Sequence, residues 1–262
     1  MGLQWSYMDR VLQSYKAKLD SWTLTSFKGD FPGENNVDFS SKFYPSGEAK
    51  PFYGLTVVAF IEPESALHIR LCDFQNRIRT ALKSAGIEEI FSFLDPLSFH
   101  MTLCDIVASS FPLDAQNLLE AVEVGRTHFP KLGNFSELTC QLIGMGVDRS
   151  LLQLANFETE SSLNQCLQLE KQLKQCFGVD ERSFLGHISL AYFVQMPVDQ
   201  LGRIKETLAP FSEEALGEFA FSRVSLCHFS DMNSYIPLLS IDLLEGSIED
   251  YRNNSKLSGT HA

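Results

Sequence analysis

A short pattern, His-x-Ser/Thr-Leu, occurs twice in this chain, each time inside an apolar run of strand character. The two copies are His100-Met101-Thr102-Leu103 and His187-Ile188-Ser189-Leu190. Because alternate residues of a β-strand point to the same face, each copy places an imidazole beside a hydroxyl and turns its two apolar residues to the opposite face. Two such strands facing each other would form a cleft with two histidines and two hydroxyls. The alternative for either copy alone is a buried strand histidine that is hydrogen-bonded to the backbone.

The elements around the two copies follow a similar order in both halves of the chain. Apolar, β-branched runs and alternation predict strands at 54–61, 99–107, 138–143, 151–157, 184–194, 219–229 and 236–244. Helical spacing predicts helices at 66–85, 114–129, 161–177 and 199–208, with Asp114 as a cap and Gly178 as a stop signal. We therefore expect an α+β fold with two pseudo-symmetric lobes, each an antiparallel sheet covered by helices, and a central cleft.

Three regions follow from this pattern. Residues 1–50 are predicted to be an N-terminal extension, with an amphipathic helix over 8–22 and then a loop rich in Gly, Pro, Asn and Ser. Two stretches of that loop, 28–30 and 42–47, could flank a site, although a plain loop is the default interpretation. Residues 51–250 form the bilobal domain, and residues 251–262 are predicted to be a flexible tail.

Composition limits the partners and the compartment. The chain has 262 residues and a formal net charge of −12, so a long duplex nucleic acid is not expected, whereas a small nucleotide or the end of a short strand is. No window of the sequence is apolar for long enough to span a membrane, and no membrane partner is expected. Six scattered cysteines, without a Cys-x-x-Cys pair or a secretory signal, are typical of reduced thiols in a cytoplasmic protein.

The motif pair and the order of elements resemble the 2H phosphoesterase superfamily, the fold of RNA 2′-5′ ligase-like proteins and cyclic nucleotide phosphodiesterases. The resemblance covers roughly residues 51–245, and Arg182-Ser183-Phe184 is similar to the Arg-x-Phe that often precedes the second histidine in the ligase-like branch. The sequence departs from that branch at Gly186, where Pro is common, and at Tyr192, where Arg is frequent. The long extension resembles an uncharacterised bacterial branch.

The resemblance implies metal-independent hydrolysis of a 2′,3′-cyclic phosphate or a related phosphodiester of a small nucleotide or short oligonucleotide end. Histidine titrates near neutrality and serves as either acid or base, so His187 is assigned as the base and His100 as the acid, although the exchanged roles fit the sequence equally well. Thr102 and Ser189 would hydrogen-bond the non-bridging oxygens. No metal site and no cofactor are expected, because no acidic cluster with metal-ligand spacing accompanies the motifs.

Two further residues are possible substrate contacts. Arg182 would orient a phosphate, or form a surface ion pair instead. Tyr192 would stack on a base, but it lies an odd number of residues beyond His187, so a regular strand would turn it away from the imidazole and into the core.

Two rival functions use the same residues differently. A non-catalytic nucleotide-binding module would keep the cleft to sense or sequester a nucleotide without turnover. A scaffold protein would leave both histidines dispensable. The presence of both histidines together with both hydroxyls favours the enzyme.

Overall fold

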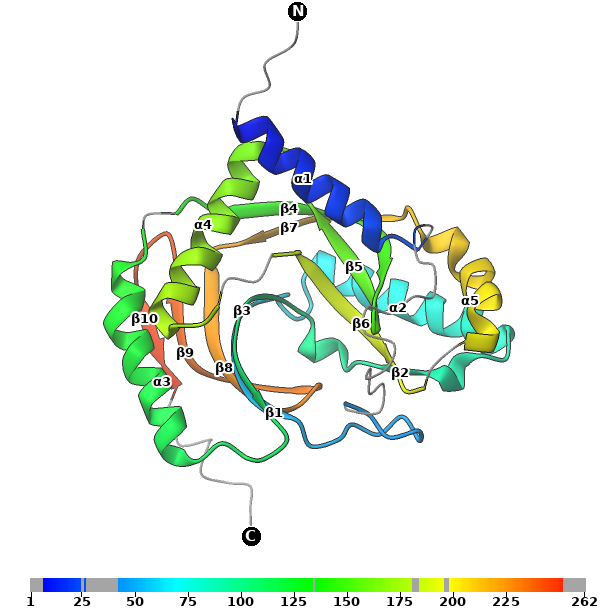
Figure 1. The fold of residues 1–262 in the computed structure, drawn as a ribbon, viewed down its shortest axis with the longest axis horizontal. Helices are drawn as coiled ribbons and strands as arrows, with labels where there is room; N and C mark the ends of the chain where they lie inside the picture. Colours follow the sequence, from blue (N-terminus) through cyan, green and yellow to red (C-terminus); the bar gives the residue numbers. More distant parts are fainter. Residues whose placement is uncertain are drawn as a thin grey trace, which may run out of the picture.

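The computed structural model describes residues 7–24, 26, 42–133, 135–180, 184–195 and 198–251. Its strands form one antiparallel sheet in the order β10-β9-β8-β1-β3-β6-β5-β4-β7, and β2 pairs with β6 (Figure 1). The strands are β1 Tyr53–Phe60, β2 Phe91–Phe93, β3 His100–Ser109, β4 Leu138–Val147, β5 Ser150–Asn156, β6 His187–Phe193, β7 Ala215–Phe221, β8 Arg223–Asp231, β9 Ser234–Asp242 and β10 Ile248–Asp250. The α-helices are α1 Tyr7–Trp22, α2 Ala66–Ser84, α3 Ala115–His128, α4 Glu160–Phe177 and α5 Leu201–Leu208.

A single residue pair joins the two halves of the sheet. Met101 of β3 pairs with Ile188 of β6, and no other pair links these two strands in the described part of the chain. The strands on one side of this junction, β10-β9-β8-β1-β3, form one lobe, and β6-β5-β4-β7 with β2 form the other. The predicted α+β fold with two lobes of antiparallel strands is confirmed, and both histidine motifs lie at the junction between the lobes.

The helices cross over between the lobes. Helix α2 comes from the first half of the chain but packs against β7 and α5 of the second lobe. Helix α4 comes from the second half and packs against β3, while α3 packs against β8 and β9 (Figure 1). Each half of the sequence therefore covers part of the other half's sheet, which ties the two lobes into one core.

Local signals in the sequence fix the helix ends. The Asp114 side chain accepts a hydrogen bond from the Asn117 N–H at 2.7 Å, which caps α3 as predicted. Gly178 ends α4 with a φ of 62°, a left-handed conformation that glycine adopts without steric cost. Near the C-terminal end, the predicted helix 199–208 is a 3₁₀ turn, Val198–Gln200, followed by α5.

The predicted pair of closing strands is wrong in one respect. The run 219–229 is two strands, β7 and β8, separated at Ser222. Strand β7 pairs with β4 in the second lobe, whereas β8 pairs with β1 and β9 in the first. The run 219–229 contains no Gly or Pro, and the polar pair Ser222-Arg223 is too weak a turn signal to predict this crossing between lobes.

The helix predicted in the N-terminal extension is α1, which packs against α4, β4 and β5. Its Tyr15 is buried; the hydroxyl donates to the Ala155 carbonyl at 2.7 Å and accepts from the Gly186 N–H at 3.2 Å. Proline at position 186 would have no N–H to donate, and a Cβ there would lie 2.9 Å from that of Ala155, which accounts for glycine at this position. Residues 1–6 and 252–262, from the predicted extension and tail, lie outside the described residues.

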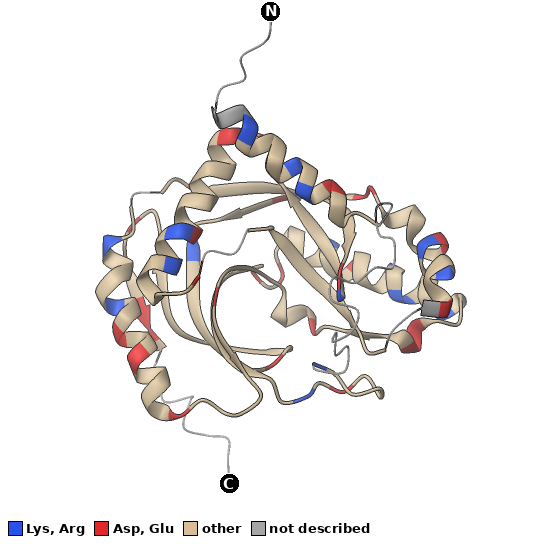
Figure 2. Cartoon of the chain, viewed as in Figure 1, with Lys and Arg blue, Asp and Glu red and all other residues tan. Residues whose placement is uncertain are grey.

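No helix among the described residues is long and apolar enough to cross a membrane. Lysines and arginines are spread over the outer helices among acidic residues and do not form one continuous basic stripe in this view (Figure 2). Each of the six cysteines is a free thiol.

Candidate active site

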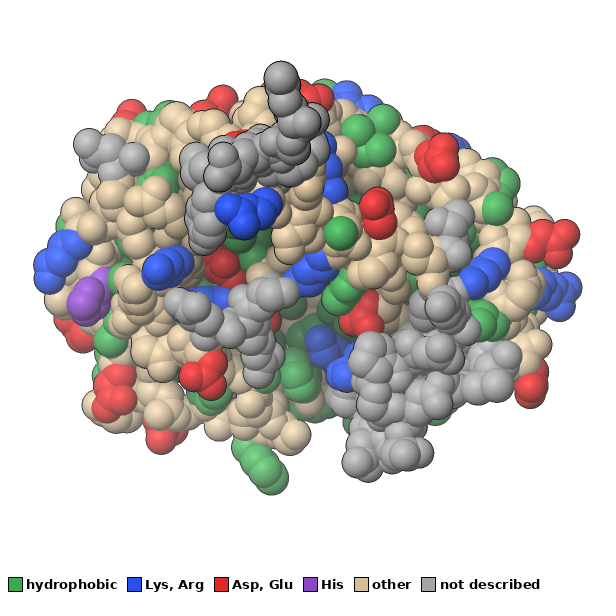
Figure 3. Space-filling view, turned by 45° about the horizontal axis from the view of Figure 1, so that its top comes forward, with side chains coloured by type: hydrophobic (Ala, Val, Ile, Leu, Met, Phe, Trp, Pro, Cys, Tyr) green, Lys and Arg blue, Asp and Glu red, His purple; other side chains and the backbone are tan. Residues whose placement is uncertain are grey.

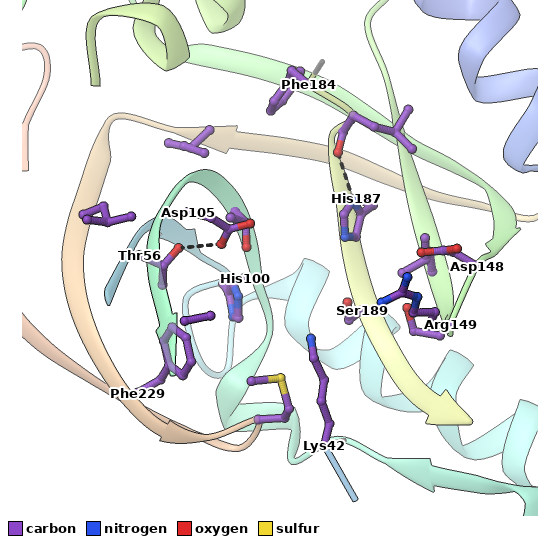
Figure 4. A pocket seen from close by; sticks show the side chains of 18 of the residues that line it. Lys42, Thr56, His100, Asp105, Asp148, Arg149, Phe184, His187, Ser189 and Phe229 are labelled. Atoms are coloured by element: carbon purple, nitrogen blue, oxygen red, sulfur yellow. Dashed lines mark hydrogen bonds between the residues drawn. The ribbon is translucent and has the colours of Figure 1, made fainter. Parts of the chain in front are cut away.

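The two lobes enclose a cavity of about 830 Å³ that the two motifs share. His100 and Thr102 of β3 line it from one side, and His187 and Ser189 of β6 line it from the other (Figure 4). Their apolar neighbours Met101, Leu103, Ile188 and Leu190 are all buried, as the alternation predicts. The structure therefore brings together the four residues that the motif pair predicts to share one cleft.

Both imidazoles are held in the same way. His100 Nδ1 lies 2.6 Å from the Ser98 carbonyl oxygen, and His187 Nδ1 lies 2.9 Å from the Leu185 carbonyl oxygen. A carbonyl oxygen only accepts, so in each ring Nδ1 carries the hydrogen and donates it. The neutral tautomer then leaves the Nε2 lone pair available for proton transfer.

The cavity shifts both histidine pKa values in the same direction. The pKa of His100 is lowered to about 4, mainly by burial and also by the nearby His187 and Lys42, while the Ser98 carbonyl and Asp105 act against this shift. Burial also lowers the pKa of His187, with the Leu185 carbonyl and two carboxylates, Asp105 and Asp148, acting against it. Both side chains are therefore neutral at pH 7 in the free protein.

Each motif ends in a one-residue β-bulge. On β3, Thr102 pairs with Val58 and Cys104 with Val57, which leaves Leu103 unpaired. On β6, Ser189 pairs with Leu152 and Ala191 with Leu151, which leaves Leu190 unpaired. The extra residue resets the alternation of the strand, so the third residue after each hydroxyl returns to the cavity face.

The bulges bring Tyr192 and Asp105 into the site. Tyr192 lines the cavity, which a regular strand would not predict, and it also packs against the buried cluster that includes Phe43 and Phe229, so the expected core contacts are present as well. Asp105 is the corresponding residue of the first motif, and it faces the cavity beside Thr56, whose hydroxyl lies 3.4 Å from the carboxylate (Figure 4). Sequence reasoning missed Asp105, although its spacing from Thr102 equals that of Tyr192 from Ser189.

A hairpin ahead of β1 supplies a cation to the cavity, and aromatic rings from other parts of the chain lie around the site. Lys42 lines the cavity, and its Nζ lies 4.7 Å from the centre of the Tyr192 ring and 5.2 Å from that of Phe52. Tyr235 of β9 lies against His100, with ring centres 4.3 Å apart. The stretch 42–47 thus does flank the site, whereas 28–30 lies outside the described residues. A loop has no periodicity, so the sequence could not place Lys42 in the cavity.

Helix α1 reaches the same cavity. Trp22, its last residue, lies beside His187 with ring centres 6.4 Å apart, and Lys18 donates to the Phe184 carbonyl at 3.1 Å. Both residues line the cavity. Arg182, the predicted phosphate contact, lies outside the described residues, so that role stays a prediction.

The charge of the cavity differs from that of the whole chain. Its lining holds four basic residues, Lys18, Lys42, Arg149 and Lys174, and four acidic ones, Asp105, Asp148, Glu170 and Asp180. The chain as a whole carries a net charge of −12, so this balance makes the cavity the less acidic part of the protein. Lysine and arginine side chains surround the hollow in the middle of the face shown in Figure 3.

In the described part of the chain, no group of three or more His, Cys, Asp or Glu side chains is arranged to hold a metal ion.

Comparison with known proteins agrees with this fold. A family model described as "2H-phosphodiest: Domain of unknown function (DUF1868)" matches residues 42–110, the segment with Lys42 and the first motif. No curated protein matches the sequence. A conserved protein of unknown function from Agrobacterium tumefaciens has the same fold, with a TM-score of 0.56 and 17% identity over 84% of this chain and 97% of that chain.

Two further solved structures are more distant. They are TT0787 of Thermus thermophilus, with a TM-score of 0.47 and 16% identity over 73% of this chain and 98% of that one, and Escherichia coli LigT complexed with NADP+, with a TM-score of 0.47 and 13% identity over 74% of this chain and 99% of that one. The match to the family model confirms the expected resemblance to the 2H phosphoesterase superfamily over residues 42–110, and the Agrobacterium tumefaciens structure shows the shared fold alone.

Proposed function

We propose that this protein is a metal-independent phosphoesterase that hydrolyses a 2′,3′-cyclic phosphate, or a related phosphodiester, of a small nucleotide or short oligonucleotide end. The observation that carries the proposal is the matched pair of imidazoles, each oriented by an Nδ1 hydrogen bond to a backbone carbonyl, in one cavity with two hydroxyls. A volume of about 830 Å³ has room for a nucleotide. The balanced charges of the lining suit a small ligand better than a long nucleic-acid backbone.

The geometry fits acid and base catalysis by the two histidines. His187 Nε2 would take a proton from water as its oxygen attacks phosphorus, and His100, protonated at Nε2, would give a proton to the departing ribose oxygen. The products are a phosphomonoester and a free ribose hydroxyl. Because both rings have the same Nδ1 bond, the exchanged roles fit the same geometry. Burial lowers the pKa of each ring and so disfavours the imidazolium in the free protein. Protonation of the acid histidine would therefore depend on the negative charge of the bound phosphate.

The remaining site residues would bind the substrate. Thr102 and Ser189 would donate hydrogen bonds to the non-bridging oxygens, where negative charge increases in the transition state. Tyr192 is a candidate stacking surface for a base, and Arg182 is a candidate phosphate contact. We propose the cytoplasm as the place of action, since six free thiols suit a reducing compartment.

The test is turnover of a panel of 2′,3′-cyclic mononucleotides, cyclic dinucleotides and 2′-5′ dinucleotides in excess EDTA. The comparison is with His100→Ala, His187→Ala and a matched histidine control, His128→Ala, at the end of α3 outside the cavity. Chelator-resistant turnover that is lost in both motif variants and kept in the control is the expected result. Activity abolished by EDTA would overturn the metal-independent mechanism.

Other outcomes favour the rival functions. Tight nucleotide binding without turnover, weakened by either histidine substitution, would make the protein a sensor or sequestering module. If no member of the panel is bound or hydrolysed, the result would favour the scaffold function. In both cases the hydrolase proposal fails.

A further inference from the structure

Lys42 stands on a hairpin that the rest of the protein holds firmly. The Lys50 N–H donates to the Lys42 carbonyl at 2.9 Å, and Phe43, which pairs with Ala49, is fully buried. The Ser92 hydroxyl donates to the Gly47 carbonyl at 2.7 Å, which fastens the turn of the hairpin to β2. The backbone at Lys42 is therefore fixed relative to the second lobe.

Aromatic faces then orient the Lys42 side chain. Its Nζ lies over the rings of Tyr192 and Phe52, at 4.7 and 5.2 Å from their centres. Figure 4 shows this nitrogen directed into the space between His100 and Ser189. Among the described residues, no ion pair is formed by Lys42, although Asp105 and Asp148 line the same cavity.

A lysine over an aromatic ring does not by itself indicate a binding site. Lys50, on the same hairpin, lies 5.0 Å from the centre of the Tyr44 ring, but it does not line the cavity, and Tyr44 is exposed. The two lysines share a hairpin and a type of contact, and they differ in what their nitrogens face. Lys42 alone of the two faces the histidines and hydroxyls.

We propose that Lys42 binds the phosphate group of the ligand, as a third contact beside Thr102 and Ser189. This inference rests on the proposed function of the cavity and names the anion-binding cation of that site. An ammonium group offers three donors and a full positive charge, which suits the oxygens of a phosphate ester. The class of ligand is a phosphate mono- or diester whose charged group lies between the histidines.

The same position gives Lys42 an effect on the histidines. Its charge lowers the pKa of both rings, together with burial, while Asp105 faces both and Asp148 faces His187. A bound phosphate would neutralise Lys42 and favour a proton on one imidazole. Lys42 would thus couple ligand binding to protonation of the catalytic pair.

The experiment measures phosphate binding and histidine titration without turnover. Calorimetry with inorganic phosphate and 3′-AMP, and NMR titration of the histidine Cε1–H signals, are compared for the wild type, Lys42→Met, Lys42→Gln, Lys42→Arg and Lys50→Met. In Lys42→Met and Lys42→Gln we expect phosphate affinity to fall about 10-fold or more. We also expect the pKa of both cavity histidines to rise by about half a unit. Lys42→Arg keeps the charge and is expected to retain most of the binding, and Lys50→Met is expected to match the wild type.

The outcomes separate this inference from the proposed function. If the wild type hydrolyses the panel but Lys42→Met and Lys42→Gln, folded by circular dichroism, keep wild-type phosphate affinity and histidine titration, Lys42 has no role in the site. Failure of the wild type to bind either probe would overturn the inference as well. If phosphate binding depends on Lys42 and nothing is hydrolysed, the inference stands and the hydrolase proposal fails.

Discussion

Asp105 and Tyr192 occupy corresponding positions in the two halves of the site. Each follows the hydroxyl residue of its motif by three positions, and the bulge at Leu103 or Leu190 turns each toward the cavity. The two halves are thus matched in histidine, hydroxyl and bulge, and they differ in charge at this fourth position. At this position a carboxylate lines the cavity in one half and a phenol in the other.

Replacement of Asp105 should alter the pH profile of the reaction. Asp105 raises the pKa of both histidines, so Asp105→Asn lowers both values and makes the protonated acid scarcer at neutral pH. We expect the alkaline limb of kcat/KM to move to lower pH by about half a unit and activity at pH 7 to fall about 3-fold. Asp73→Asn, on the surface of α2, serves as the control. An unchanged profile would show that the carboxylate has no electrostatic role.

The wild-type profile of kcat/KM should peak on the acid side of pH 6.5. The reaction needs one protonated and one neutral histidine, and kcat/KM reports the pKa values of the free protein. Burial puts the pKa of His100 at about 4 and lowers that of His187, so both rings are neutral above pH 6.5 and the acid is lost there. As the pH falls further the second histidine is protonated in turn and the base is lost. A maximum at pH 8, measured with a cyclic mononucleotide, would contradict this arrangement.

Loss of either motif hydroxyl should reduce kcat more than it raises KM. Thr102→Val and Ser189→Ala each remove a donor aimed at the phosphate, and we expect kcat to fall about 100-fold. Thr102→Ser keeps the hydroxyl and should retain most of the activity, which separates donor loss from disturbed packing. Steady-state kinetics on one substrate of the panel decides the point. Equal kcat in Thr102→Val and Thr102→Ser would exclude the hydroxyl as a donor.

Removal of the Tyr15 hydroxyl should destabilise the protein. In Tyr15→Phe the buried Ala155 carbonyl and Gly186 N–H lose their partner, which costs about 1–3 kcal/mol in the free energy of unfolding. Urea denaturation monitored by circular dichroism measures the change. Tyr44→Phe is the matched control, because Tyr44 is 43% exposed and its substitution should change stability little. Equal stability of the two variants would mean that the buried bonds contribute nothing net.

Ligand binding should change the fluorescence of Trp22. The chain has two tryptophans, so a Trp5→Phe background leaves Trp22 as the sole reporter. Trp22 lines the cavity beside His187, and we expect a nucleotide to alter its emission through ring contact, with inorganic phosphate giving a smaller change. Trp22→Phe in the same background gives the blank. A nucleotide that binds by calorimetry without changing the emission must lie away from α1.

Local patterns in the sequence determined the centre of the site. The two-residue period of a strand placed His100 beside Thr102 and His187 beside Ser189, with their apolar neighbours buried, because alternation depends on the strand alone. Cap and stop residues set the ends of α3 and α4 for the same reason, since an N-cap such as Asp114 and a left-handed glycine such as Gly178 act within one turn.

Tertiary structure decided what surrounds that centre. A bulge exists only in relation to the partner strand, so the sequence could not show that Asp105 and Tyr192 turn toward the cavity. The crossing between β7 and β8 follows from which strand each of them pairs with, and a run without Gly or Pro does not predict it. Lys42 and Trp22 reach the site from a loop and from the end of a helix, where only long-range packing fixes the position of a side chain.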